Sequence, residues 1–142
     1  MATVRQILEK KGTQVWTITA EHTVYDALRL MGEKEIGALA VVAEGQVVGM
    51  ISERDYARKV VLKGKTSRET QVREIMTTPV LFVSPEQSVA ECMTIMTEKR
   101  VRHLPVIEKG ALVGMISQGD LVKSIIDEQQ FIIGQLESYI AQ

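Results

Sequence analysis

Two stretches of the chain have apolar residues in the pattern i, i+3, i+4, i+7. These residues are Val24, Ala27, Leu28 and Met31 in the first stretch, and Val89, Cys92, Met93 and Met96 in the second. The spacing places them on one face of a helix. A hydroxyl residue, Thr23 or Ser88, precedes each stretch, and an acid follows it three positions later, which is the pattern of a helix capping box. The pattern therefore predicts two amphipathic helices that begin there, with Cys92 in the core.

Short β-branched runs predict strands around these helices. Strands are expected at 15–19 and 80–84 before the helices, and as pairs at 39–43 with 47–51 and at 104–107 with 112–116 after them. Glu44-Gly45 and Lys109-Gly110 separate the members of each pair and suit hairpin turns. Further helices are expected after Ser52 and after Ser117, with the second reaching the C-terminus. Short helical lead-ins are expected from Val4 and Val72.

The chain repeats itself with an offset of about 65 residues. GQVVGMISERD from Gly45 aligns with GALVGMISQGD from Gly110, and GMIS-x-x-D is identical in both copies. We therefore predict an α/β (α+β) fold of two β-α-β-β-α units at 8–64 and 72–128, joined by a polar linker and followed by a helical extension at 129–142. Each copy alone is too small to bury much core, so the two copies are expected to pack together.

Composition excludes several classes of protein. The chain has 142 residues, 45% of them hydrophobic, and a formal net charge of −1, which is typical of a globular domain and leaves no excess positive charge for general nucleic-acid binding. No apolar run approaches the roughly 18 residues of a membrane span, and the charged N-terminal segment lacks the apolar core of a secretory signal. We therefore expect a cytoplasmic protein with no membrane association. One cysteine and two histidines provide neither a disulfide nor a metal-ligand cluster.

The repeated motif places a hydroxyl and a carboxylate at the start of each final helix. Ser52 with Asp55, and Ser117 with Asp120, have capping-box spacing, which by itself favours a structural role. The glycine upstream in both copies permits close approach of another molecule, and a helix N-terminus attracts phosphate. A carboxylate accepts hydrogen bonds from neutral donors such as ribose hydroxyls. Hydroxyl and acid together therefore indicate a nucleoside ligand.

The duplicated unit, with G-x-I-S-x-x-D closing each copy and LPVI before the second hairpin, resembles a tandem pair of CBS (cystathionine β-synthase) domains, the Bateman module. The resemblance covers about residues 8 to 127. It implies two repeats packed about a pseudo-two-fold axis. It also implies clefts between them for adenine ligands such as AMP, ADP, ATP, NAD or S-adenosylmethionine. Modules of this family commonly dimerise into a disc.

The resemblance assigns roles to particular residues. Asp55 and Asp120 match the ribose-binding acid, and Ser52 and Ser117 match the nearby hydroxyl. The remaining positions are those expected to line the clefts for base and phosphate, namely Ile36, Gly37, Ala38, Val101, Arg102, His103 and Pro105, together with the lead-in positions Thr13, Gln14, Trp16, Thr77, Thr78, Pro79 and Leu81.

The two copies differ in their basic residues. Arg54 precedes the acid in the first copy where Gly119 stands in the second, and Arg102-His103 replaces Gly37-Ala38. We expect Arg54 and Arg102 to contact phosphate, and the two clefts to differ in affinity or in preferred ligand. Two roles suit His103 equally well, a contact to phosphate and a neutral, partly buried hydrogen-bond donor. Trp16 is expected in the core. At the rim of a cleft its ring would also be able to stack on a base.

Three functional classes remain. The leading interpretation is a non-catalytic regulatory module that senses adenine nucleotides. An adaptor with vestigial sites that binds an unknown protein is the alternative, while the sequence offers no nucleophile with an adjacent base to support an enzyme. The apolar tail FIIGQLESYI exceeds what a small core needs, so the module is expected to form a homodimer.

Overall fold

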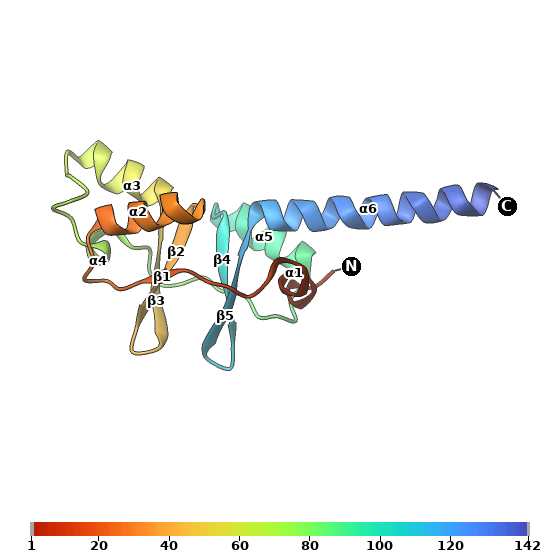
Figure 1. Cartoon of the computed structure of the whole chain (residues 1–142), viewed down its shortest axis with the longest axis horizontal. Coiled ribbons are helices and arrows are strands. Elements are labelled where there is room, and N and C mark those ends of the chain that lie inside the picture. The colour runs from red at the N-terminus through yellow and green to blue at the C-terminus, as the bar shows by residue number, and fades with distance from the viewer. Residues whose placement is uncertain (1, 142) are drawn as a thin grey trace. The chain divides into compact units, whose positions relative to one another are not determined.

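The computed structural model describes residues 2–141 and has a mixed α/β fold, as predicted (Figure 1). The first repeat contains α1 (Val4–Lys11), β1 (Thr17–Ile18), α2 (Val24–Lys34), β2 (Ala38–Ala43), β3 (Gln46–Ser52), α3 (Glu53–Lys59) and the 3₁₀ turn η1 (Val61–Lys63). The second contains α4 (Val72–Ile75), α5 (Val89–Lys99), β4 (His103–Glu108), β5 (Ala111–Ser117) and α6 (Gln118–Ala141). Both predicted lead-in helices, α1 and α4, are present.

The chain divides into two compact units that do not coincide with the order of the repeats. Unit 1 comprises the chain up to Gln14, Phe82–Glu108 and the chain from Val113 onward, while unit 2 comprises Val15–Leu81 and Lys109–Leu112. Helix α1, the first element of the first repeat, thus belongs with α5 and α6 of the second repeat. The boundaries 8–64 and 72–128 stay a prediction.

Unit 2 contains a three-stranded sheet in the order β1-β2-β3. Strand β1 pairs with β2 in parallel, and β2 pairs with β3 antiparallel, with Leu39 opposite Ile51. The turn residues Glu44 and Gly45 have φ of 51° and 77°, the left-handed conformation that a two-residue hairpin requires. Helix α2 begins at the predicted Thr23 capping box and contributes Val24 to the core of this unit.

Unit 1 contains β4 and the greater part of β5, which form a two-stranded sheet, with α1, α5 and the start of α6 around its core. Helix α5 begins at the predicted Ser88 capping box. The buried core side chains include Val4, Leu8, Val89, Cys92, Leu104, Ile116 and Leu121. Cys92 is fully buried, which confirms its predicted place, and burial together with the Glu91 charge raises the pKa of its thiol to about 11.

The predicted strand at 80–84 is wrong. Within it only Val83 pairs, as a single parallel bridge in which its amide donates to the Pro105 carbonyl at 3.1 Å and its carbonyl accepts from Ile107 at 2.9 Å. Pro79 and Pro85 flank the run and lack the N–H groups that would extend the ladder. The predicted strand at 15–19 is likewise shorter, because β1 comprises Thr17–Ile18.

Helix α6 is the longest element, with 24 residues, and it extends well past the other elements of unit 1 (Figure 1). Leu121, in its first turn, is buried, whereas every residue from Gln129 to Ala141 is exposed. The predicted extension is therefore helical as far as the described residues reach, and Gln142 lies outside them. Among residues 2–141, no helix combines the length and apolarity needed to cross a membrane.

Candidate functional site

The first candidate site lies where β3 ends and α3 begins. The Ser52 hydroxyl accepts a hydrogen bond from the Asp55 amide at 3.2 Å, and Asp55 Oδ2 accepts one from the Ser52 amide at 2.9 Å. This is the reciprocal capping box considered from the sequence, and its geometry is confirmed. A carboxylate has about four lone-pair positions, so capping alone does not saturate it.

Two further groups donate to the Asp55 carboxylate. The Thr77 hydroxyl donates to Oδ1 at 3.2 Å, and Lys59 Nζ lies 3.1 Å from the same oxygen. Lys59 follows Asp55 by one helical turn and also donates to the Ile75 carbonyl at 2.9 Å. The Asp55 side chain is 13% exposed, so this carboxylate is largely buried beside a cation and a hydroxyl.

The second candidate site repeats this arrangement where β5 ends and α6 begins. Asp120 Oδ2 accepts from the Ser117 amide at 2.8 Å, and the Ser117 hydroxyl accepts from the Asp120 amide at 3.1 Å. The Asp120 side chain is 23% exposed, so it is more accessible than Asp55. Both repeats therefore present a capped carboxylate at the N-terminus of their final helix.

Lys11, the last residue of α1, is the cationic partner of Asp120. Its Nζ lies 2.6 Å from Asp120 Oδ2 and donates to the Met115 carbonyl at 2.8 Å. Burial raises the pKa of Asp120, but hydrogen bonds and charge from Lys11 and hydrogen bonds from Ser117 outweigh it, so the pKa lies below its usual value. The carboxylate is therefore ionised at neutral pH and can accept hydrogen bonds from a ligand.

The lead-in segment at the start of each repeat donates to the acid of the other repeat. Thr77, near the start of the second repeat, contacts Asp55 in the first, while Lys11, near the start of the first repeat, contacts Asp120 in the second. Each of these pairs lies within one compact unit. Backbone hydrogen bonds of 2.7 and 3.2 Å between Thr77 and Met50 fix the first of these segments to β3. The exchange explains why α1 belongs to unit 1.

The glycines of the repeated motif make room for this chain's own side chains. A Cβ atom on Gly49 would lie 2.7 Å from the Met76 sulfur, and one on Gly114 would lie 2.7 Å from a Leu8 methyl group. The expectation that these glycines admit another molecule is therefore wrong. They allow the residues around the lead-in helices to pack against β3 and β5.

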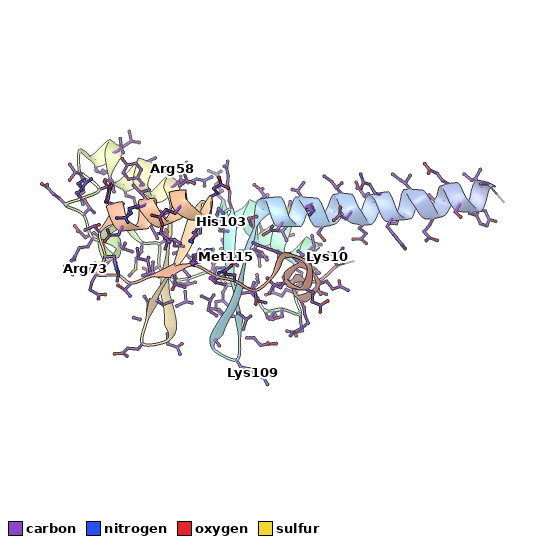
Figure 2. The ribbon with its side chains drawn as sticks, viewed as in Figure 1. Lys10, Arg58, Arg73, His103, Lys109 and Met115 are labelled. Atoms are coloured by element: carbon purple, nitrogen blue, oxygen red, sulfur yellow. The ribbon has the colours of Figure 1, made fainter. Side chains whose placement is uncertain are left out.

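His103 is the first residue of β4 and lies close to the start of α6 (Figure 2), and Arg102 directly precedes it. The Arg102 carbonyl accepts from the Gln118 amide at 2.8 Å, which joins this segment to the helix bearing Asp120. Burial lowers the pKa of His103, the charges of Lys11 and Arg102 lower it further, and Asp120 raises it. His103 is therefore a neutral, partly buried imidazole at neutral pH, while the Arg102 side chain is exposed.

The predicted site positions are divided between the two units. Unit 2 contains Trp16, Ile36, Gly37, Ala38, Ser52, Arg54, Asp55, Thr77, Thr78, Pro79 and Leu81, and unit 1 contains Thr13, Gln14, Val101, Arg102, His103, Pro105, Ser117 and Asp120. Ile36 and Gly37 line a hollow of about 300 Å³ with Glu53. Ala38 and Pro105 are buried in their strands, and Trp16 packs at the edge of its core with the Lys34 ammonium 4.2 Å from its ring centre. The ligand roles of all these residues stay predictions.

Sequence reasoning missed the two lysines. Lys59 could have been found, because a lysine four residues after an acid on a helix is a recognisable ion-pair spacing. Lys11 could not, because it is more than 100 residues from Asp120 in sequence. Lys11 and Asp120 also line an open groove of about 820 Å³ along α1 and α6, together with Ile7, Lys123 and Phe131, a size within the range of small-molecule sites.

Comparison with known proteins agrees with this architecture. A solved CBS-domain protein of Burkholderia ambifaria MC40-6, described as a candidate signal-transduction protein, is 53% identical and superposes with a TM-score of 0.87 over 90% of this chain and 96% of that chain. The mitochondrial CBS-domain protein CBSX3 of Arabidopsis thaliana is 37% identical over 148 residues, covering 97% of this chain and 71% of that protein. The CBS-domain protein YhcV of Bacillus subtilis (strain 168) is 33% identical over 109 residues, covering 77% of each.

The CBS domain family model matches the chain twice, at residues 4–62 and 72–127. The two matches coincide with the two copies of the internal repeat, and each includes one of the capped carboxylates. CBS domains are generally non-catalytic and typically bind adenosine ligands. The chain therefore belongs to the CBS domain family, as a tandem pair of CBS domains that forms a Bateman module.

Proposed function

We propose that this module binds adenine nucleotides and thereby regulates the activity of another protein, without catalysing a reaction itself. The observation that supports this most directly is the repeated site, in which Asp55 and Asp120 each sit at a helix N-terminus beside a capping hydroxyl and a lysine ammonium. In each site the carboxylate can accept hydrogen bonds from ribose hydroxyls, and the helix N-terminus together with the lysine ammonium attracts phosphate. Each site thus combines the two kinds of group that a nucleotide requires.

A bound nucleotide would compete for the lysine ammonium that each acid now holds. Lys11 is held by Asp120 and by the Met115 carbonyl, so a phosphate competes with the carboxylate for this ammonium. When the phosphate takes the ammonium, the carboxylate gains acceptor capacity for the ribose. Lys59 and Asp55 allow the same exchange in the first repeat. We further assign phosphate contacts to Arg54, Arg102 and His103.

The non-catalytic assignment is based on the side chains that could take part in catalysis. Cys92 is buried and its pKa is raised to about 11, so it is no nucleophile. Within residues 2–141, no cluster of three or more histidine, cysteine or acidic side chains is arranged to hold a metal ion. Each acid is ion-paired in its cap, which suits binding better than proton transfer.

One observation favours the adaptor alternative with vestigial sites. The space beside Gly49 and Gly114 is filled by Met76 and Leu8, and both acids already have cationic partners. A protein partner would then be recognised elsewhere on the surface.

The expected cytoplasmic location also stays a prediction, and the Arabidopsis relative is mitochondrial by its name.

A ligand panel separates these functions. We expect at least one of AMP, ADP, ATP, NAD and S-adenosylmethionine to raise the melting temperature and to bind in calorimetric titration. A ligand at 100 times its Kd adds about 2.7 kcal/mol to the free energy of unfolding, which a thermal shift detects. If none of the five binds at millimolar concentration, the adaptor alternative holds. If a bound nucleotide is converted to product, the non-catalytic assignment fails.

A further inference from the structure

The exposed part of α6 has a regular apolar stripe. Val122, Ile126, Ile133, Leu136 and Ile140 are 41%, 45%, 53%, 57% and 80% exposed. With Gln129 they form a series whose spacings alternate between four and three residues. This is the a/d repeat of a coiled coil, with isoleucine at every a position and Val122, Gln129 and Leu136 at the d positions. All six positions of the stripe are exposed, so unit 1 does not cover them.

The helix needs a partner to account for its length. Beyond Glu128, every residue of α6 up to Ala141 is exposed, so tertiary packing within the chain does not support this half (Figure 2). Helical segments of fewer than roughly 12 to 15 residues are marginal in water without such packing. The heptad pattern supplies an alternative source of stability, which is a second helix with the same repeat.

We propose that α6 pairs in antiparallel orientation with α6 of a second copy of this chain. In that orientation each a position faces a d position of the other helix. Ile126 faces the second copy's Leu136, Ile133 faces its Gln129, and Ile140 faces its Val122, and each pair occurs twice by symmetry. The overlap extends from Val122 to Ile140, about 28 Å at 1.5 Å per residue, and it uses the whole stripe. This assembly is independent of nucleotide binding.

Charge selects the antiparallel orientation. Lys123 is the last basic residue of the chain, and Asp127, Glu128 and Glu137 follow it. Lys123 and Glu137 both lie at e positions beside the stripe. The antiparallel pair places Lys123 of one helix against Glu137 of the other at both ends, and e positions face each other in that arrangement. A parallel pair would leave Glu137 without a cation and would align the acidic halves.

Gln129 fits the same register. Its counterpart in the second helix lies about 6 Å away along the axis, because four residues separate their layers at 1.5 Å per residue. The two amides can therefore hydrogen-bond across the seam, which offsets the cost of burying them. A polar residue at one seam position fixes register in coiled coils.

Cysteine cross-linking tests both the pairing and its orientation. Val122→Cys and Ile140→Cys are made as separate full-length variants and treated with a short bismaleimide, alone and as an equimolar mixture that has been allowed to exchange subunits. The native Cys92 is buried, so it does not compete for the reagent. We expect the mixture to give a covalent dimer and each variant alone to remain uncross-linked, because like positions lie at opposite ends of the pair. Efficient cross-linking of either variant alone would show a parallel pair and overturn the proposal, as would failure of the mixture.

A control and a charge exchange complete the test. Ser138 points away from the stripe, so a mixture of Val122→Cys with Ser138→Cys should not cross-link. Self-association is then measured by sedimentation. We expect Lys123→Glu and Glu137→Lys each to weaken it about fivefold, and the double variant to restore it, since two exposed ion pairs together contribute about 1 kcal/mol. A wild-type monomer at micromolar concentration, or no rescue in the double variant, would exclude the antiparallel pair.

Discussion

The two capped carboxylates are alike in their helix and different in their cation. Asp55 and Asp120 use the same serine-aspartate box, in which backbone amides donate to side-chain oxygens at 2.8 to 3.2 Å. Asp55 takes its ammonium from its own helix, through Lys59 at 3.1 Å, whereas Asp120 takes it from α1, through Lys11 at 2.6 Å. The local motif therefore repeats, while the element that supplies the cation differs between the two sites.

The repeat alignment shows that the lysine has changed position. Ser124 occupies in the second copy the place that Lys59 has in the first copy, so the helix of Asp120 has no lysine at this position. Each acid has an ammonium nearby, but in only one copy does that ammonium lie on the acid's own helix. A cation beside the acid, and not a particular sequence position, is the feature that both sites share. We interpret this as a requirement of anion binding.

The largest expected effect comes from removing either acid. Asp55→Ala and Asp120→Ala should each weaken nucleotide binding at their own site about a hundredfold, because two hydrogen bonds to a charged acceptor contribute about 3 kcal/mol. Calorimetric titration of each variant against the best ligand of the panel measures this loss. If the two variants lose affinity unequally, the two sites differ in how much they rely on the acid.

The matched controls for these variants are Ser52→Ala and Ser117→Ala. They remove the capping hydroxyl and retain the carboxylate, so each should cost about 1 kcal/mol in free energy of unfolding with a smaller loss of affinity. Aspartate variants that lose only this much stability and bind nucleotide normally would leave Asp55 and Asp120 with a capping role alone.

The second prediction concerns the basic residues that distinguish the copies. Arg102→Ala should weaken AMP binding ten- to a hundredfold, because a charge-assisted contact from arginine to phosphate contributes about 1.5 to 3 kcal/mol. Adenosine lacks the phosphate and should bind the variant almost as well as it binds the wild type. An equal loss for AMP and adenosine would mean that Arg102 shapes the site without touching phosphate.

The fold was largely predictable because its signals are local. The capping boxes at Thr23 and Ser88, the hairpin turns at Glu44 and Lys109 and the duplicated motif all lie within a few residues of sequence, and the structure contains each of them. The strand predicted at 80–84 failed because Pro79 and Pro85 remove the ladder donors around it.

The candidate site was predictable only in part, because its contacts extend across the repeats. The acids and serines follow from the motif itself. The α1 lysine does not, since nothing near Lys11 indicates that its helix packs beside the second repeat. The glycines misled for the same reason, because the side chains that fill the space beside them, Met76 and Leu8, come from distant lead-in segments.

The third prediction moves the lysine of unit 1 to the position that it has in unit 2. Lys11→Met should raise the pKa of Asp120, since that ammonium opposes the effect of burial. Adding Ser124→Lys to this variant should lower the pKa again, because residue 124 follows the acid by one helical turn as Lys59 follows Asp55. Carboxyl chemical shifts followed by NMR over a pH titration measure both changes. No change on removing Lys11 would mean that the ion pair with Asp120 does not persist in solution.

The smallest expected effect concerns His103, which has no counterpart in the first copy. Its pKa in the folded chain lies below its usual value because of burial and the charges of Lys11 and Arg102. Below its usual pKa near 6.5, the unfolded chain therefore binds a proton that the folded chain resists, so stability falls as the pH decreases from about 6.5 towards the folded value. Denaturant unfolding at a series of pH values should show this decline in the wild type and a flatter profile in His103→Gln. His22→Gln, in the loop after β1, is the matched variant and shows whether the effect belongs to His103. If wild type and His103→Gln lose stability in parallel between pH 6.5 and 5, the imidazole is not held neutral by its surroundings, and the second site does not differ from the first in this respect.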